Sequence, residues 1–307
     1  MSPDSPIIVL DSGLGGLTVV RALRNVLPGE DILYFGDTAR LPYGSKTGAT
    51  VTGFVQQIIA YLRPYDAKHV VIACNTATAL SLPAVRATFP GLSISGVIEP
   101  GAKAATAAAG AKQVPTIAVL ATEATIRSKA YERAIHRRRL HARMLLRPAP
   151  LLVPIIEEGR DATDPLVRLA LQQYLGPLLT HHMDVLVLGC THYPVYKDLI
   201  CKIVGNAVRV IDSAEQCADD VARRLKIRKL LNDAGPADGT AGQDSPGREQ
   251  PPRSGQLRCF VTDDPARFQR LAPRFLGVAI DKPAWVAPDE LYGHAAPDGG
   301  GRLSVPA

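Results

Sequence analysis

The 307-residue sequence contains no long apolar run, and cysteine and aromatic residues are scarce. No stretch approaches the roughly 20 apolar residues with which a helix crosses a bilayer, so we expect no membrane-spanning segment and no membrane partner. Residues 1–5 lack the basic region and cleavage site of a secretory signal, which makes the cytoplasm the expected location. The five cysteines, at positions 74, 190, 201, 217 and 259, form no Cys-x-x-Cys pair and no Cys/His cluster. The sequence therefore predicts neither a disulfide framework nor a zinc site.

Positive charge is in modest excess, with a formal net charge of +6. Part of it is concentrated in residues 136–143, HRRRLHAR, where six of the eight side chains are His or Arg. Binding of single-stranded nucleic acid would require aromatic residues interleaved with these arginines, and this run contains none. We therefore interpret the run as a solvated basic face and do not expect a nucleic-acid partner.

Short apolar runs alternate with amphipathic segments along the chain. We expect strands at 7–10, 32–35, 70–73, 93–98, 116–121, 151–156, 185–188, 208–211 and 257–261. Helices are expected at 17–27, 50–62, 79–89 and 265–275. This alternation is typical of an α/β fold, in which mainly parallel sheets are covered by helices.

The strand-loop unit at residues 7–16 recurs at residues 116–128, so the sequence predicts two related halves. Residues 232–255 and the end of the chain, 293–307, are rich in Pro and Gly or lack apolar periodicity. We expect a disordered insertion in the first case and a disordered tail in the second.

Two of the cysteines occupy matching positions. Cys74 follows the strand at 70–73, and Cys190 follows the strand at 185–188. The carboxyl end of a parallel strand is where α/β folds bind ligands, and amides at a helix start favour a thiolate. Burial as a small apolar residue is the commoner fate of a single free cysteine. The repeated setting argues against that reading for these two, whereas the other three cysteines are interpreted as structural.

The neighbours of these cysteines are suited to binding a carboxylate. Asn75 and Thr76 follow one cysteine, and Thr191 and His192 follow the other. Small polar residues are poor choices for a core but good hydrogen-bond donors. Two thiols across a site can act as base and acid, one removing a proton from a carbon and the other returning a proton to its opposite face. Such chemistry requires no metal and no cofactor.

Three further positions are candidates. Asp11 and Ser12 lie in a glycine-rich loop whose spacing matches neither the dinucleotide nor the P-loop fingerprint. Asp11 would bind an ammonium group or orient a base, and capping of the next helix is the alternative. Tyr43 and Gly44 would present backbone amides to a carboxylate, unless they form a simple turn. His192 is placed to tune Cys190 or to exchange a proton with it.

Several of these motifs together resemble the glutamate racemases, cofactor-independent enzymes that supply D-glutamate for bacterial peptidoglycan. The resemblance rests on residues 11–16, 35–44, 73–77, 153–159 and 189–194, covers most of residues 6–231, and resumes at about 259–277. It implies that Cys74 and Cys190 are the catalytic thiols. It also implies helper roles for Asp11, Glu157 (next to Glu158) and His192. The implied substrate contacts are Asp11, Ser12, Tyr43, Gly44, Asn75, Thr76, Thr191 and His192.

The resemblance also implies an architecture. Two similar α/β domains face each other, with the active site in the cleft between them. The first takes residues 1–98 plus 208–292, interrupted by the insertion at 232–255, and the second takes residues 99–207. Homodimers are common in that family, and a small molecule, L- or D-glutamate, is the expected substrate.

Two other functions remain open from the sequence. A pair of thiols does not encode side-chain length, so aspartate or another amino acid is an alternative substrate. The other alternative is a non-catalytic binding protein, such as a modulator of DNA gyrase, for which the basic run at 136–143 is the support.

Overall fold

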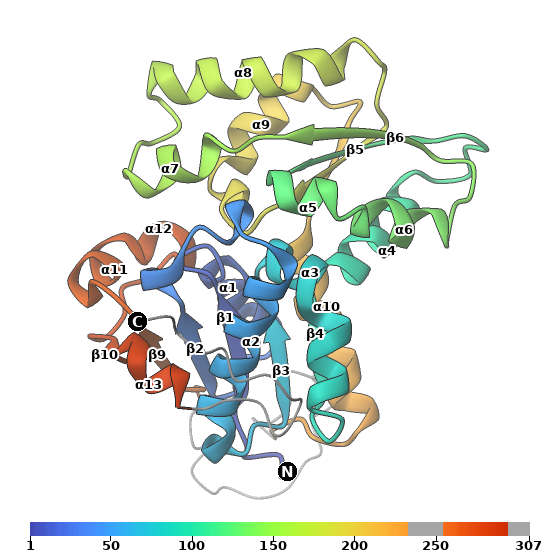
Figure 1. The fold of residues 1–307 in the computed structure, drawn as a ribbon. Coiled ribbons are helices and arrows are strands. Elements are labelled where there is room, and N and C mark those ends of the chain that lie inside the picture. The colour runs from blue at the N-terminus through green and yellow to red at the C-terminus, as the bar shows by residue number, and fades with distance from the viewer. Residues whose placement is uncertain (233–253, 294–307) are drawn as a thin grey trace, which may run out of the picture.

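Two parallel β-sheets organise the protein in a computed structural model, which describes residues 1–232 and 254–293 (Figure 1). The first sheet has the strand order β10-β9-β2-β1-β3-β4, and the second has the order β6-β5-β7-β8. All adjacent strands pair in parallel. The α/β fold with two similar sheet domains is therefore confirmed. The predicted insertion and tail fall almost entirely outside the described residues.

The strands of the first sheet are β1 (Ile7–Asp11), β2 (Ile32–Gly36), β3 (His69–Ile72), β4 (Ile94–Gly96), β9 (Leu257–Val261) and β10 (Ala284–Trp285). Those of the second are β5 (Thr116–Ala121), β6 (Arg143–Pro148), β7 (Val185–Gly189) and β8 (Arg209–Asp212). The α-helices are α1 (Leu17–Val26), α2 (Gly48–Leu62), α3 (Asn75–Thr88), α4 (Ile98–Ala108), α5 (Glu123–Arg127), α6 (Ala130–His136), α7 (Leu152–Glu157), α8 (Pro165–Leu179), α9 (Lys197–Val204), α10 (Ser213–Ile227), α11 (Pro265–Leu271), α12 (Pro273–Leu276) and α13 (Pro288–Tyr292). Short 3₁₀ helices span Thr38–Arg40, Tyr43–Ser45, Arg63–Tyr65 and Tyr193–Tyr196.

The two sheets share one connectivity. In the first, β1 lies between β2 and β3, with β4 beyond β3. In the second, β5 lies between β6 and β7, with β8 beyond β7. The chain thus reverses its direction across the sheet at β1 and again at β5, and ligands of open α/β sheets bind at such reversal points. Cys74 follows β3 and Cys190 follows β7, which are equivalent strands. The topology gives the two thiols matching locations.

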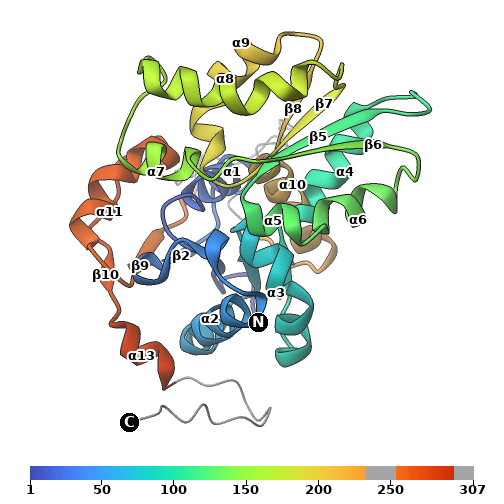
Figure 2. The ribbon, with the colours of Figure 1, turned by 45° about the horizontal axis from the view of Figure 1, so that its top comes forward.

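Side chains bury both faces of each sheet, as expected for parallel strands. On β1, Ile7 and Val9 join the cluster formed with α1 and α10, whereas Ile8 and Leu10 join the cluster of α2 and α3 on the other face. The first of these clusters continues into the face of the second sheet that α8 and α9 cover. Helices α4 and α6 cover the remaining face (Figure 2). A shared core therefore joins the two sheets.

The structure differs from the sequence-based assignments in three places. The segment predicted as a strand at 151–156 is helix α7, in which Leu152, Ile155 and Ile156 are buried at helical spacing. Strand β6, which directly precedes it, was not predicted. It is an edge strand with partly exposed side chains, including Arg143 and Arg147, so it lacks the apolar run of a central strand. The helix predicted at 265–275 is divided into α11 and α12, because a proline begins the second helix.

The domain division stays a proposal, with one adjustment. Strand β8 pairs with β7 and so completes the second sheet. The following helix, α10, packs against α1 beside the first sheet. We propose that the chain returns to the first domain after Asp212, rather than at residue 208. Within residues 1–232 and 254–293, no helix combines the length and hydropathy needed to cross a membrane.

Candidate active site

A cavity of about 340 Å³ lies between the carboxyl ends of the two sheets. The loops that line it follow β1, β2 and β3 of the first sheet, and β5, β6 and β7 of the second. Its lining includes most residues predicted for the site: Ser12, Tyr43, Gly44, Cys74, Asn75, Thr76, Glu157, Cys190, Thr191 and His192. Of the predicted residues, Asp11 alone is absent from this lining. A cavity of this size between two strand-end edges accommodates a small ligand.

The Cys74 thiol is buried at the start of α3. Its Sγ accepts a hydrogen bond from the Ala77 amide over 3.4 Å and donates one to the Ser12 hydroxyl over 3.8 Å. Burial and the nearby Asp11 carboxylate raise the pKa of this thiol to about 12, against the opposing effect of the Ala77 amide. At neutral pH, Cys74 is therefore a protonated thiol.

The environment of the Cys190 thiol differs from that of Cys74, because His192 lies beside it and Glu157 lies on the other side of the His192 ring. Its Sγ lies 3.9 Å from Nδ1 of His192, and Nε2 of His192 lies 2.9 Å from Oε1 of Glu157. Burial lowers the pKa of His192, but its hydrogen bonds and charge interactions with Cys190 and Glu157 outweigh burial and raise this pKa to about 10. The imidazole is thus protonated at neutral pH. It is placed to stabilise a thiolate or to hand over a proton.

The structure separates Glu157 from its neighbour Glu158. Burial raises the pKa of Glu157, but the hydrogen bond and charge of His192, aided by Arg267, lower it below its usual value. Glu157 therefore stays ionised beside the imidazolium. Glu158 pairs with Arg160 and is exposed. Only the first of the two glutamates faces the predicted site.

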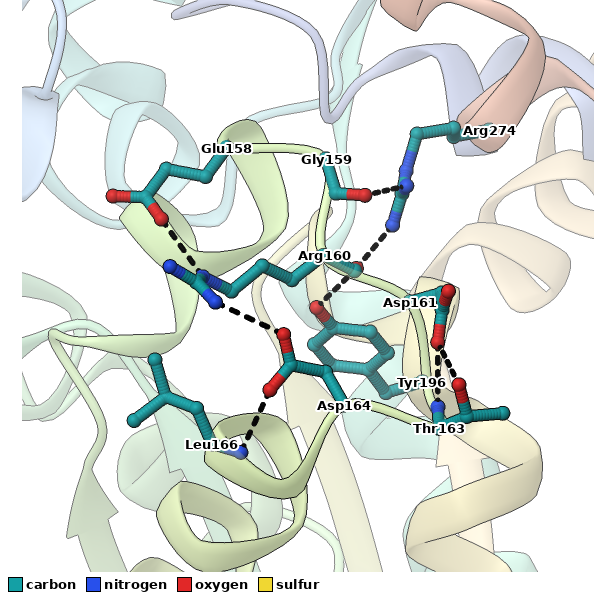
Figure 3. A network of polar contacts seen from close by, with 9 residues as sticks. All are labelled: Glu158, Gly159, Arg160, Asp161, Thr163, Asp164, Leu166, Tyr196 and Arg274. Atoms are coloured by element: carbon teal, nitrogen blue, oxygen red, sulfur yellow. Dashed lines mark hydrogen bonds and ion pairs between the residues drawn. The ribbon is translucent and has the colours of Figure 1, made fainter.

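The segment after Glu157 is held by a network that spans both halves of the chain (Figure 3). Arg274, on α12, donates hydrogen bonds to the backbone carbonyls of Gly159 and Arg160. The Tyr196 hydroxyl donates to the same Arg160 carbonyl over 2.8 Å. Arg267, on α11, donates to the Glu157 carbonyl over 3.2 Å. These contacts fix the carboxyl end of α7, and with it the position of the Glu157 side chain.

Asp11 occupies the end of β1 beside both thiol motifs. Its Oδ2 accepts a hydrogen bond from the Gly13 amide over 3.0 Å, and its Oδ1 accepts one from the Thr191 hydroxyl over 3.3 Å. Burial raises its pKa above the usual value, although the His192 charge opposes this. Asp11 is thus linked to Thr191 and acts electrostatically on Cys74. A direct ligand contact by Asp11 stays a prediction.

Tyr43 lines the cavity, but its hydroxyl points to a buried carboxylate. The hydroxyl donates to Oδ2 of Asp37 over 2.5 Å, and the same carboxylate accepts from Arg40 and Thr262. The ring and backbone of Tyr43 therefore remain for a ligand. Gly44 lies against Thr122 of the second sheet, since a Cβ at this glycine would be 3.2 Å from the Cβ of Thr122.

Sequence reasoning missed two threonines at the site. Thr122, which lines the cavity, and Thr125 follow β5. The hydroxyl oxygen of Thr76 lies 2.9 Å from that of Thr122 and 3.2 Å from that of Thr125. Their position in the sequence could have identified them as site residues, because they follow β5 as Ser12 follows β1. A cluster of hydroxyls from both sheets thus forms part of the cavity wall.

Two other predictions concern regions outside this wall. None of residues 136–143 lines the cavity, and Arg137 and Arg138 of that run form ion pairs with Glu99. Part of the basic run is therefore occupied in internal contacts. In the described ranges, 1–232 and 254–293, no three His, Cys, Asp or Glu side chains gather as a group that could hold a metal ion.

Comparisons with known proteins agree with this geometry. A family model described as Asp/Glu/Hydantoin racemase matches residues 17–220. A glutamate racemase of Syntrophus aciditrophicus is 43% identical over 275 residues, which are 90% of this chain and 94% of that protein. The structure of a glutamate racemase from Francisella tularensis in complex with D-glutamate has a TM-score of 0.78 and 34% identity, covering 93% of this chain and 98% of that one. A Thermus thermophilus glutamate racemase in complex with β-chloro-D-alanine has a TM-score of 0.77 and 37% identity, covering 94% of this chain and 100% of that one. The chain belongs to the Asp/Glu/Hydantoin racemase family.

Proposed function

We propose that the protein interconverts L- and D-glutamate, with Cys74 and Cys190 as the two acid-base groups. The observation that carries the proposal is the presence of both thiols in one cavity, at equivalent strand ends of two similar sheets. Relatives named as glutamate racemases cover nearly the whole chain. We further propose that the product D-glutamate supplies peptidoglycan synthesis, as the family resemblance implies.

The proposed reaction needs one proton removed and one returned. A thiolate takes the α-proton, so that an S–H bond forms while the C–H bond breaks and its electron pair moves into the carboxylate as an enolate. The thiol on the other face then gives its proton to the same carbon, and its sulfur is left as thiolate. The two cysteines exchange roles in the reverse reaction. No electrons leave the system, and no other reactant is consumed.

The environments of the two thiols indicate which cysteine is protonated before each enantiomer binds. Cys74 is protonated at neutral pH, whereas the His192 imidazolium lies beside Cys190. A form with a Cys74 thiol and a Cys190 thiolate is ready to remove the proton from L-glutamate. The family resemblance implies the same assignment, in which Cys74 takes the proton from D-glutamate and Cys190 takes the proton from L-glutamate. For the return reaction, the ammonium group of the bound substrate would favour a Cys74 thiolate.

Hydroxyl and amide donors around the cavity support an amino acid with two carboxylates. Ser12, Asn75, Thr76, Thr122 and Thr191 all line it and come from both sheets. Hydrogen bonds to ionised carboxylates are stronger than those between neutral groups. The relative rates with L-aspartate and L-glutamate would decide between these substrates, since the shorter side chain would leave one group of donors unpaired.

The test is hydrogen exchange in D2O, followed by NMR of the α-hydrogen together with circular dichroism. Wild-type protein should exchange the α-hydrogen of L-glutamate while the optical signal decays to zero. Cys74→Ser should still exchange L-glutamate but not invert it, and Cys190→Ser should do the same for D-glutamate. Racemisation at the wild-type rate in either variant would refute the two-thiol mechanism. A homodimer stays a prediction, which light scattering of the purified protein would check.

A further inference from the structure

A buried hydrogen bond joins the two halves of the chain beside the cavity. The hydroxyl of Tyr131, on α6, donates to Oδ1 of Asn75, at the start of α3, over 2.7 Å. Each of the two residues is only 2% exposed. Asn75 lines the cavity directly after Cys74, whereas Tyr131 is not part of the lining. The Tyr131 hydroxyl thus reaches the cavity lining through the Asn75 carboxamide.

The other end of this carboxamide is unpaired. Nδ2 of Asn75 is buried and has no hydrogen-bond partner among residues 1–232 and 254–293. A buried donor without an acceptor is costly, and such groups in folded proteins usually have a partner. An acceptor from a ligand in the cavity would satisfy this nitrogen. A carboxylate is such an acceptor, since its oxygens only accept hydrogen bonds when ionised.

The Tyr131 side chain packs closely against two glycines, Gly189 and Gly101. A Cβ added at Gly189 would lie 3.1 Å from Cε2 of the ring, and one added at Gly101 would lie 3.4 Å from its hydroxyl oxygen. Gly189 directly precedes Cys190, so the ring fits against the backbone that carries the second thiol. Burial raises the pKa of Tyr131 well above its usual value, and the hydroxyl therefore remains protonated and able to donate.

We propose that Tyr131 is a positioning residue that holds the Asn75 carboxamide with Nδ2 toward a carboxylate of the substrate. This inference rests on the proposed racemisation of glutamate. Without the phenol hydroxyl, the carboxamide can rotate and present Oδ1 instead, and an amide oxygen repels a carboxylate. The orientation of the Asn75 carboxamide therefore also depends on the relative position of the two sheets, because Tyr131 follows a strand of the second sheet and Asn75 follows a strand of the first.

The first test is Tyr131→Phe, which keeps the ring and removes only the hydroxyl. We expect KM for both enantiomers to rise about fivefold to tenfold, the effect of one lost hydrogen bond, with kcat within about twofold of wild type. The dissociation constant of D-glutamate, measured by calorimetry, should rise by the same factor. Tyr174→Phe is the matched control. It removes a buried hydroxyl that accepts a hydrogen bond from the Leu151 amide and does not line the cavity, so KM should not change.

The second test is a double-mutant cycle with Asn75→Ala, which separates positioning from general structural damage. In the Asn75→Ala background, Tyr131→Phe should change KM by less than about twofold, because the group it positions is gone. The same rise in KM in both backgrounds, or an unchanged KM in the single variant, would overturn the inference. Absence of glutamate turnover in the wild-type protein would instead refute the proposed function. Thermal unfolding of each variant confirms that it is folded.

Discussion

Nε2 of His192 lies 2.9 Å from Oε1 of Glu157, although Glu157 ends α7 and His192 lies 35 positions further along the chain, after β7. The ion pair is buried, and Nδ1 of the same ring faces the Cys190 sulfur. Both nitrogens of a protonated imidazole are donors. The His192 ring therefore forms a relay between the Glu157 carboxylate and the Cys190 thiol.

Glu157→Gln should lower kcat at least tenfold, because the neutral amide no longer stabilises the His192 imidazolium. The loss should also lower the pKa of His192, so the alkaline limit of activity should move to lower pH. A pH profile of kcat measures both effects. Glu158→Gln is the control, since that exposed side chain pairs with Arg160 and should leave the profile unchanged. An unchanged alkaline limit in Glu157→Gln would contradict the relay.

The stability of the protein should depend on the ionisation of His192. Its pKa is raised from 6.5 to about 10 by folding, so the stabilisation is fully present below about pH 6.5 and is lost as the pH rises through about 10. The melting temperature of wild type should therefore exceed that of His192→Asn by more at pH 6 than at pH 10.5. Calorimetric melting of both proteins across this range is the measurement. A difference that stays constant with pH would count against a charged His192.

Gly15→Ala should reduce activity at least a hundredfold. A Cβ at this position would lie 2.3 Å from Oγ1 of Thr191 and 2.5 Å from Nδ1 of His192, so both side chains must move. The expected loss corresponds to removal of the His192 contribution to proton transfer. Gly53→Ala is the matched control, because a Cβ at that glycine in α2 meets no atom within 4 Å. That change should keep full activity and stabilise the helix by about 1 kcal/mol.

Arg274→Ala should destabilise the protein by about 2 kcal/mol, since it removes charged hydrogen bonds to the carbonyls of Gly159 and Arg160 (Figure 3). Because these bonds hold the segment after Glu157, kcat should fall as well. Denaturant unfolding and steady-state kinetics measure the two effects. Arg270→Ala, on the exposed side of α11, is the control and should change neither. Wild-type stability in Arg274→Ala would show that the network contributes little.

Much of the site was predictable because it depends on where strands end. Apolar runs mark β3 and β7, and the carboxyl ends of parallel strands meet at one edge of a sheet. Cys74 and Cys190, with the residues that follow them, therefore had to lie near their sheet edges. In the structure, both line one cavity. Thr122 and Thr125 follow the same rule after β5 and could have been found by applying it there.

The local sequence pattern did not predict the secondary structure correctly where burial depends on the neighbouring helices and strands. A short apolar run suits a strand or a buried helix, and in α7 packing against α8 decided for the helix. Strand β6 contains arginines because it is an edge strand of its sheet, and only the strand order shows this.

The sequence by itself determined the α/β class, the repeat of the strand-loop unit and the positions of the two thiols, since these follow from the spacing of apolar and polar residues along the chain. Tertiary structure decided which groups surround each thiol. The pairing of His192 with Glu157 and the bond from Tyr131 to Asn75 join residues 35 and 56 positions apart. Contacts over such separations depend on how the two sheets pack against each other, which no local pattern encodes.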